Sequence, residues 1–171
     1  AHWTRTLTDA GTVQTGNFDA AWTFLSCAEF HTWPDPPTRF PDDFGEAEGK
    51  DVGSTTAYVD PDDPTIIHFA IDNGYPSYAV DCQVHFANTC TIPWSIRGTT
   101  IEAGSDNLHN CTLSGNQTKT LSCDELTVVY ADGIGTQVDP EDGGASSLTV
   151  HVEQLAEPDT TYYFDVRVCV S

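Results

Sequence analysis

The sequence of 171 residues has no methionine and very few basic residues, 6 lysines and arginines against 26 aspartates and glutamates. The formal charge of -20 repels phosphates and anionic head groups, so we expect no nucleic-acid or membrane partner. No apolar run approaches the roughly 20 residues of a membrane span. Because the chain starts at Ala1 without an initiator methionine, we expect that a secretion signal has been removed and that the protein is extracellular.

Motifs of common enzyme classes are also missing. There is no HExxH motif, and the six histidines lack the i, i+4 spacing of such a zinc site. They are His2, His31, His68, His85, His109 and His151. No GxSxG motif nominates a nucleophilic serine, although a triad assembled only in space stays open. We therefore expect that the protein is not an enzyme.

Six cysteines are present without a CxxC pair, which favours disulfides over a zinc site. They are Cys27, Cys82, Cys90, Cys111, Cys123 and Cys169. The polar segment between Cys111 and Cys123 can fold back as a hairpin, so we predict that these two are bonded. Cys82 and Cys90 lie too far apart along an extended strand to pair with each other. Their partners would be Cys27 and Cys169, in either pairing, and a bridge between subunits is also open.

Alternation of apolar and polar residues predicts an all-β protein, because side chains along a strand point to opposite faces in turn. The clearest strands are Tyr78 to Ala87 and Tyr162 to Val170. Weaker strands fit residues 18–24, 66–71, 94–100, 126–130 and 148–152. The stretch from His31 to Asp51 is too rich in proline and charge for a sheet and is predicted as a surface loop. We expect one domain over residues 1–171, built as a two-sheet β-sandwich.

Several segments resemble those of one family of secreted fibre proteins. They are Thr15-Gly16-Asn17-Phe18, the run Asn73 to Tyr78 (NGYPSY), the run Asn88 to Pro93 (NTCTIP), Val150 to Gln154 and Thr161 to Phe164. In this order and spacing they are similar to the TasA/camelysin-like proteins, including archaeal bundling pilins, with Cys90 where the family usually has glycine. The resemblance implies a jelly-roll-like β-sandwich with an extended N-terminal strand, acting as the structural subunit of a cell-surface filament or pilus.

The resemblance also implies polymerisation of identical subunits by donor-strand exchange, in which a segment of one subunit completes a sheet of the next. Residues 1–10 are the candidate donor strand. Trp3, Arg5 and Leu7 share one face of this segment, and Trp3 and Leu7 would be its apolar anchors. Alternatively, the segment pairs within its own subunit or frays.

Two other binding functions fit residues in the sequence. Calcium prefers oxygen ligands from acidic turns, and two such turns offer them. Their candidate ligands are Asp60, Asp62 and Asp63 in one turn, and Asp139, Glu141 and Asp142 in the other. A monomeric carbohydrate-binding β-sandwich is the second alternative, with Trp33 in a loop, Trp94, and Trp22 expected in the core. The sequons at Asn110 and Asn116 are candidate glycosylation sites.

Overall fold

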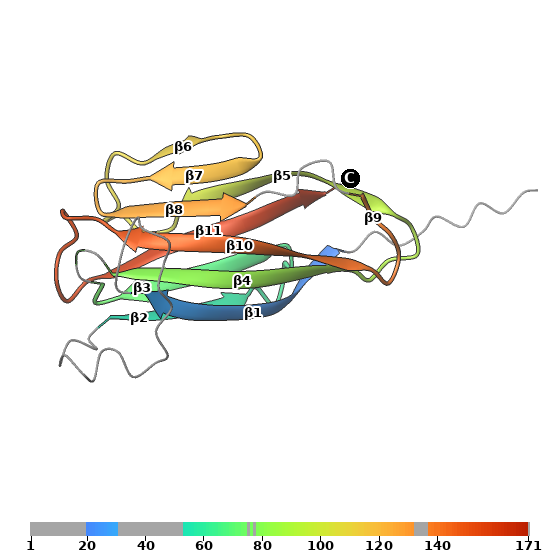
Figure 1. Cartoon of the computed structure of the whole chain (residues 1–171), viewed down its shortest axis with the longest axis horizontal. Coiled ribbons are helices and arrows are strands. Elements are labelled where there is room, and N and C mark those ends of the chain that lie inside the picture. The colour runs from blue at the N-terminus through green and yellow to red at the C-terminus, as the bar shows by residue number, and fades with distance from the viewer. Residues whose placement is uncertain (1–19, 31–52, 75, 77, 132–136, 171) are drawn as a thin grey trace, which may run out of the picture.

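The computed structural model describes residues 20–30, 53–74, 76, 78–131 and 137–170, which form two antiparallel β-sheets packed face to face (Figure 1). The strands are β1 (Ala20–Phe30), β2 (Ser54–Val59), β3 (Ile66–Asp72), β4 (Ala79–Asn88), β5 (Trp94–Ala103), β6 (Thr112–Ser114), β7 (Thr118–Ser122), β8 (Leu126–Ala131), β9 (Gln137–Val138), β10 (Gly143–Val152) and β11 (Thr161–Val170). The predicted all-β sandwich is confirmed. No helix in the described ranges is long and apolar enough to cross a membrane.

The chain passes repeatedly from one sheet to the other. One sheet has the order β1-β4-β10-β8-β7-β6 and the other the order β2-β3-β11-β5-β9. Consecutive strands therefore lie in different sheets at β1 to β2, β3 to β4, β4 to β5 and β5 to β6, and again at each step from β8 to β11. This repeated crossing is the jelly-roll-like feature of the fold, and it makes neighbours of strands that are distant in sequence, such as β3 and β11.

The core lies between the sheets and follows the predicted alternation. In β4 the side chains of Val80, Cys82, Val84 and Phe86 are buried, while His85 is exposed. In β11 the side chains of Tyr162, Phe164, Val166 and Val168 are buried, while Tyr163, Arg167 and Cys169 are exposed. Aromatic rings pack across the space between the sheets, as where Phe86 of β4 contacts Trp94 of β5, and Phe86 also packs against Trp22 in its own sheet. Burial of such large rings supplies much of the free energy of folding.

The disulfides agree with the prediction in part. Cys111 is bonded to Cys123 as predicted, and Cys27 is bonded to Cys82, which is one of the two pairings left open. The complementary bridge between Cys90 and Cys169 is wrong, because Cys90 is buried in the core and Cys169 is exposed on the outer face of β11. Both keep thiol side chains.

Several strands differ from the predicted ones. Strand β1 continues to Phe30, and β10 begins at Gly143, directly after the predicted calcium ligand Asp142. At Gly143 an added Cβ would approach the backbone oxygen of Phe86 to 2.5 Å, and at Gly144 it would approach the Phe86 ring to 2.5 Å, so glycine at both positions lets β10 pair closely with β4. The predicted donor segment 1–10, the segment 15–18 and the loop 31–51 lie outside the described residues.

Candidate functional site

A sandwich can add a foreign strand only at the edge of a sheet, where backbone N–H and C=O groups lack a partner strand. Among the strands that the structure describes, the edge strands are β1 and β6 in one sheet and β2 and β9 in the other. They differ in strand length, in how far neighbouring segments already occupy their open side, and in how deeply their side chains are buried. These differences decide which edge suits strand addition.

Three of the four edges are poorly suited. Strand β1 is bonded at Trp22 to the turn between β2 and β3, where the Trp22 backbone N–H donates to Pro64 O at 3.0 Å and the indole Nε1 donates to Thr65 O at 2.9 Å. Strand β6 is three residues long, and all three are exposed. Strand β2 alternates between exposed and half-buried side chains, so it offers no deeply apolar face.

The fourth edge is different, because β9 covers only a small part of β5. Strand β9 pairs with β5 at Trp94 and Ser95 alone. On its other side β5 pairs with β11 from Ile96 to Ala103. Among the described strands, none pairs with the outer edge of β5 over this range, which we call the β5 edge. At about 3.3 Å per residue its length is roughly 25 Å, enough for a full strand.

The side chains of β5 make this edge suitable for an apolar strand. Ile96, Thr99 and Ile101 point into the sandwich and are buried. Trp94 Nε1 and Thr100 Oγ1 are buried polar atoms without a hydrogen-bond partner in the described part of the chain. Buried polar groups normally have partners, and leaving one without costs about 1–3 kcal/mol. The β5 strand therefore combines an open backbone edge, an apolar inner face and unsatisfied polar groups.

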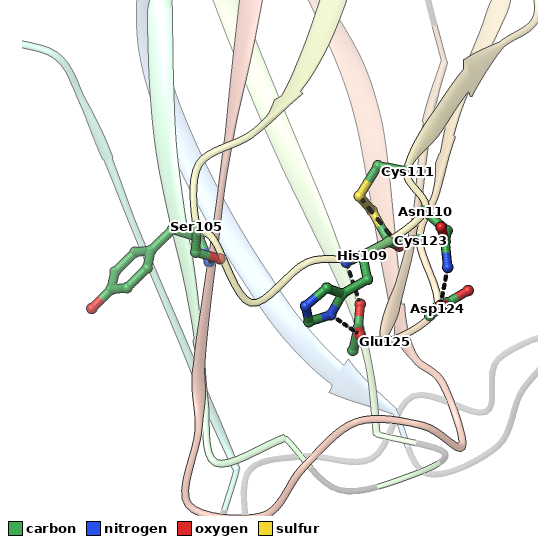
Figure 2. Close-up of a disulfide and its surroundings, with 8 residues drawn as sticks. Ser105, His109, Asn110, Cys111, Cys123, Asp124 and Glu125 are labelled. Atoms are coloured by element: carbon green, nitrogen blue, oxygen red, sulfur yellow. Dashed lines mark hydrogen bonds and ion pairs between the residues drawn. A yellow bond between two sulfur atoms is a disulfide. The ribbon is translucent and has the colours of Figure 1, made fainter.

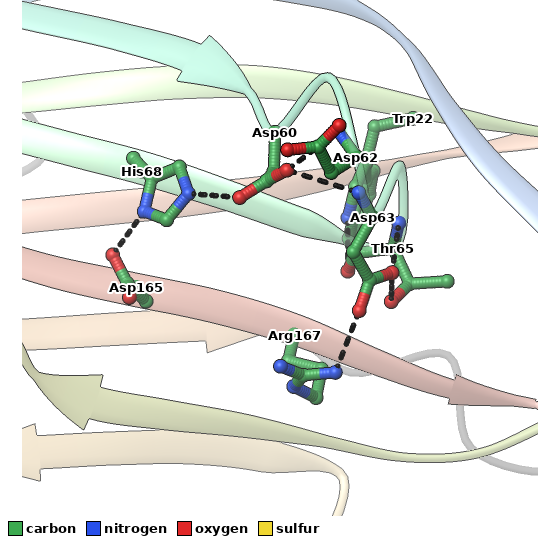
Figure 3. Close-up of polar contacts among 8 residues, drawn as sticks. All are labelled: Trp22, Asp60, Asp62, Asp63, Thr65, His68, Asp165 and Arg167. Carbon is green, nitrogen blue, oxygen red and sulfur yellow. Dashed lines mark hydrogen bonds and ion pairs between the residues drawn. The ribbon is translucent and has the colours of Figure 1, made fainter.

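The first acidic turn, Asp60 to Thr65, uses its carboxylates to hold its own backbone (Figure 3). Asp60 Oδ1 accepts hydrogen bonds from the backbone N–H groups of Asp62 and Asp63, at 2.7 and 2.9 Å. Asp63 Oδ1 accepts from the backbone and hydroxyl of Thr65, while its Oδ2 accepts from Arg167 at 2.9 Å. These bonds lower the pKa of Asp63, the Thr65 hydroxyl contributing most. The carboxylates of Asp60 and Asp63 therefore already accept hydrogen bonds from the backbone of the turn, from Thr65 and from Arg167.

His68 joins this turn to β11. Its Nε2 lies 2.8 Å from Asp60 Oδ2, and its Nδ1 lies 2.7 Å from Asp165 Oδ1. A carboxylate oxygen only accepts, so two such contacts require a proton on both ring nitrogens. The bond to Asp60, followed by that to Asp165, raises the pKa of His68, and the same bond to His68 lowers the pKa of Asp60 to about 2. The histidine is therefore held as a cation between two carboxylates.

This arrangement predicts that His68 stabilises the fold more at acidic pH. The raised pKa of His68 gives a contribution to folding stability that is complete below the ordinary pKa of 6.5 and is lost as the pH rises through the pKa of the folded state. The lowered pKa of Asp60 gives a contribution to folding stability that is complete above pH 3.8 and is lost as the pH falls toward about 2. We expect His68→Asn to lower the Tm more at pH 5 than at pH 9. His85→Asn, on an exposed strand position, is the control, and an equal loss for His68→Asn at both pH values would contradict the assignment.

The same turn fastens the two sheets together. Thr65 O accepts both from Trp22 Nε1 and, at 3.1 Å, from the backbone N–H of Val168. We expect Trp22→Phe, which keeps an aromatic ring but removes the indole donor, to lower the free energy of unfolding by about 0.5–1.5 kcal/mol. Urea denaturation measures this change. A loss above about 3 kcal/mol would show that ring packing, and not the hydrogen bond, is the main contribution.

The second acidic turn is organised by Asn88, a residue that the sequence reasoning placed in a motif without giving it a role. Asn88 is buried, and its Nδ2 donates to Ile92 O and Val138 O, both at 2.9 Å. Its Oδ1 accepts from the backbone N–H of Cys90, and its backbone bonds to Glu141 and Asp142. The segment Asn88 to Pro93 is therefore a structural hub that joins β4, β5, β9 and the 139–142 turn.

The predicted calcium ligands are not gathered into a cation site. Asp139 Oδ1 accepts from Gln137, and Asp142 Oδ1 accepts from the backbone N–H of Gly143. Over the ranges that the structure describes, no group of three or more histidine, cysteine or acidic residues is placed to hold a metal ion. Calcium at either turn stays a prediction, and it would have to replace these hydrogen-bond donors.

The tryptophans of the carbohydrate-binding alternative are also placed. Trp22 is buried, as predicted for a core residue, and Trp94 is also buried, with only 1% of its surface exposed. A buried indole cannot stack on a sugar, so Trp94 is removed from that alternative. Trp33 lies outside the described residues.

The disulfide at the base of the β6–β7 hairpin lies beside two further polar pairs (Figure 2). The His109 backbone N–H and Nδ1 contact the carboxylate of Glu125 at 2.8 and 2.7 Å, and Asn110 Nδ2 donates to Asp124. Burial alone would raise the pKa of Glu125, but the bonds from His109 outweigh it and the pKa is lowered. The pairs hold the segment before β6 against the one before β8.

Comparison with known proteins adds nothing to this geometry. No protein-family model, curated protein or solved structure matches the chain.

Proposed function

We propose that this protein is the structural subunit of an extracellular filament and that its subunits join by strand addition at the β5 edge. The observation that carries the proposal is that edge itself, a length of backbone from Ile96 to Ala103 without a partner among the described strands, backed by buried side chains. The donor would be residues 1–10 of the next subunit. Its alternating residues and its anchors Trp3 and Leu7 suit an apolar inner face.

A polar atom on β5 supports the same proposal. An added strand brings a row of backbone N–H and C=O groups to the β5 edge, where Thr100 Oγ1 has no hydrogen-bond partner in the described part of the chain. An added strand would also widen the five-stranded sheet along the part of β5 that β9 leaves open, since β9 pairs with only two residues of β5. In the opposite sheet, the hydrogen bonds of Trp22 to the 60–65 turn and the shortness of β6 make addition less favourable.

Net charge sets the conditions for assembly. Two subunits with a formal charge of -20 each repel one another, and salt screens that repulsion over about 8–10 Å at physiological ionic strength. We therefore expect filaments to form more readily as the salt concentration rises. This dependence is opposite to that of an assembly held together by surface ion pairs.

Electron microscopy of the purified protein tests the proposal. At high protein concentration and at least physiological salt, we expect ordered fibres of uniform width. A protein that stays monomeric in gel filtration and shows no fibres would contradict the proposal. Retention of such a monomer on a polysaccharide column would favour the carbohydrate-binding alternative instead.

A further inference from the structure

The β6–β7 hairpin forms the outer edge of the six-stranded sheet and carries both sequons. It is closed at its base by the disulfide between Cys111 and Cys123. Asn110 lies just outside that disulfide, and Asn116 lies in the turn between the two strands. Both side chains are exposed, but their surroundings differ.

The turn presents Asn116 to solvent without using its side chain. Gly115 has a φ of 92°, and a Cβ there would collide with Thr118 O, so glycine is needed at this position. Lys119 Nζ donates to Gly115 O at 3.0 Å and holds the turn from outside. Asn116 and Thr118 are both exposed, and the Asn116 amide forms no hydrogen bond within the described part of the chain. The amide and the hydroxyl of this sequon are therefore both accessible.

Asn110 is held in place. Its Nδ2 donates to Asp124 Oδ2 at 2.6 Å, a short bond to a charged acceptor. The backbone N–H of Asp124 donates to His109 O at 3.0 Å, and the neighbouring Cys111 is in the disulfide. The nitrogen that would carry a glycan is thus occupied, on a segment that the disulfide fixes.

We propose that Asn116 carries an N-linked glycan and that Asn110 does not. In the reaction, Nδ2 of Asn116 forms a bond to the anomeric carbon of an activated glycosyl phosphate. The phosphate leaves with the electron pair of the broken bond, and the amide nitrogen loses one proton. This inference rests on the proposed extracellular function, because N-glycosylation of such sequons belongs to exported proteins.

A glycan at this turn would also protect the edge of the sheet. Strand β6 is too short to accept a full strand, but its three exposed residues, with Leu113 45% exposed, still leave backbone groups open to a short contact with another chain. A bulky hydrated group at the adjacent turn obstructs an incoming strand there. Addition is then directed to the β5 edge on the other sheet.

Mass spectrometry of the protein from its natural host tests this inference. After reduction and digestion, fragmentation assigns any added mass to Asn110 or to Asn116. We expect glycan mass on Asn116 alone, with complete loss of it in Asn116→Gln and in Thr118→Ala. Thr118→Ser keeps the sequon and should keep the glycan, and Asn110→Gln should leave it unchanged. Unmodified Asn116, or a glycan on Asn110, would overturn the inference.

Electron microscopy of the same preparation separates this inference from the proposed function. Fibres built from protein with unmodified Asn116 would contradict the proposed glycosylation and support the proposed filament. Glycosylated protein that forms no fibres would support the glycan and contradict the filament.

Discussion

Deleting residues 1–10 is expected to abolish polymerisation while leaving a folded monomer. The buried apolar residues of the described sandwich run from Trp22 to Val168, so the deletion removes none of them. It does remove the proposed donor, whose large anchors Trp3 and Leu7 are worth about 1.5–3 kcal/mol each when fully buried. Each ladder hydrogen bond that the donor forms adds about 0.5–1.5 kcal/mol. Electron microscopy measures the loss of fibres, and near-ultraviolet circular dichroism shows whether the monomer is folded.

Two single substitutions sharpen this test. Trp3 and His2 lie on opposite faces of an extended strand, so only one of them can point into the sandwich. We expect Trp3→Ala to raise the concentration needed for assembly much more than His2→Ala. Normal fibres from the truncated protein would show that strand addition by this segment is wrong and that contacts between sandwich surfaces drive assembly.

The strands that could be predicted are those whose inner face is continuously apolar. Strands β4 and β11 alternate without interruption, and each occupies a central place in its sheet. Strand β2 was missed because its sequence STTAYV gives no apolar alternation, and its structure has no fully buried side chain. Strand β9 is only two residues long, and β6 is fully exposed. Periodicity cannot detect strands that contribute little to the core.

The candidate site was harder to predict than the fold. The acidic residues of the first turn were found, but their partners were not, because Arg167 is 104 residues from Asp63 and reaches it only through the pairing of β3 with β11. The open β5 edge is likewise a property of sheet order, since it depends on how little of β5 is covered by β9. Residue type predicted the kind of chemistry, while topology decided which groups meet.

Replacing both Cys27 and Cys82 with alanine is expected to lower the free energy of unfolding by about 4 kcal/mol. The two residues are 55 apart in sequence, and the loss of a cross-link over that distance restores chain entropy worth about this much to the unfolded state. Replacing both residues avoids adding a further thiol to those of Cys90 and Cys169. Urea denaturation measures the change, and the Tm should fall by roughly 8–16 °C.

The second disulfide provides a matched control within the same chain. Cys111 and Cys123 are only 12 residues apart, so their double alanine variant should lose about 3 kcal/mol. Equal or reversed losses would show that packing around the sulfurs, and not the length of the closed loop, decides the contribution of each bridge.

The bridge between Cys27 and Cys82 also has a mechanical consequence in a filament. It joins two residues that face each other directly in β1 and β4, and β4 is the only described strand that pairs with β1. Strand β1 is the first described strand after the proposed donor, so a force applied to the donor is transmitted first to β1. Without the covalent bond, the hydrogen bonds between β1 and β4 could open one pair at a time from the end. We therefore expect filaments of the Cys27→Ala, Cys82→Ala variant to break under shear at lower force than filaments of the Cys111→Ala, Cys123→Ala variant.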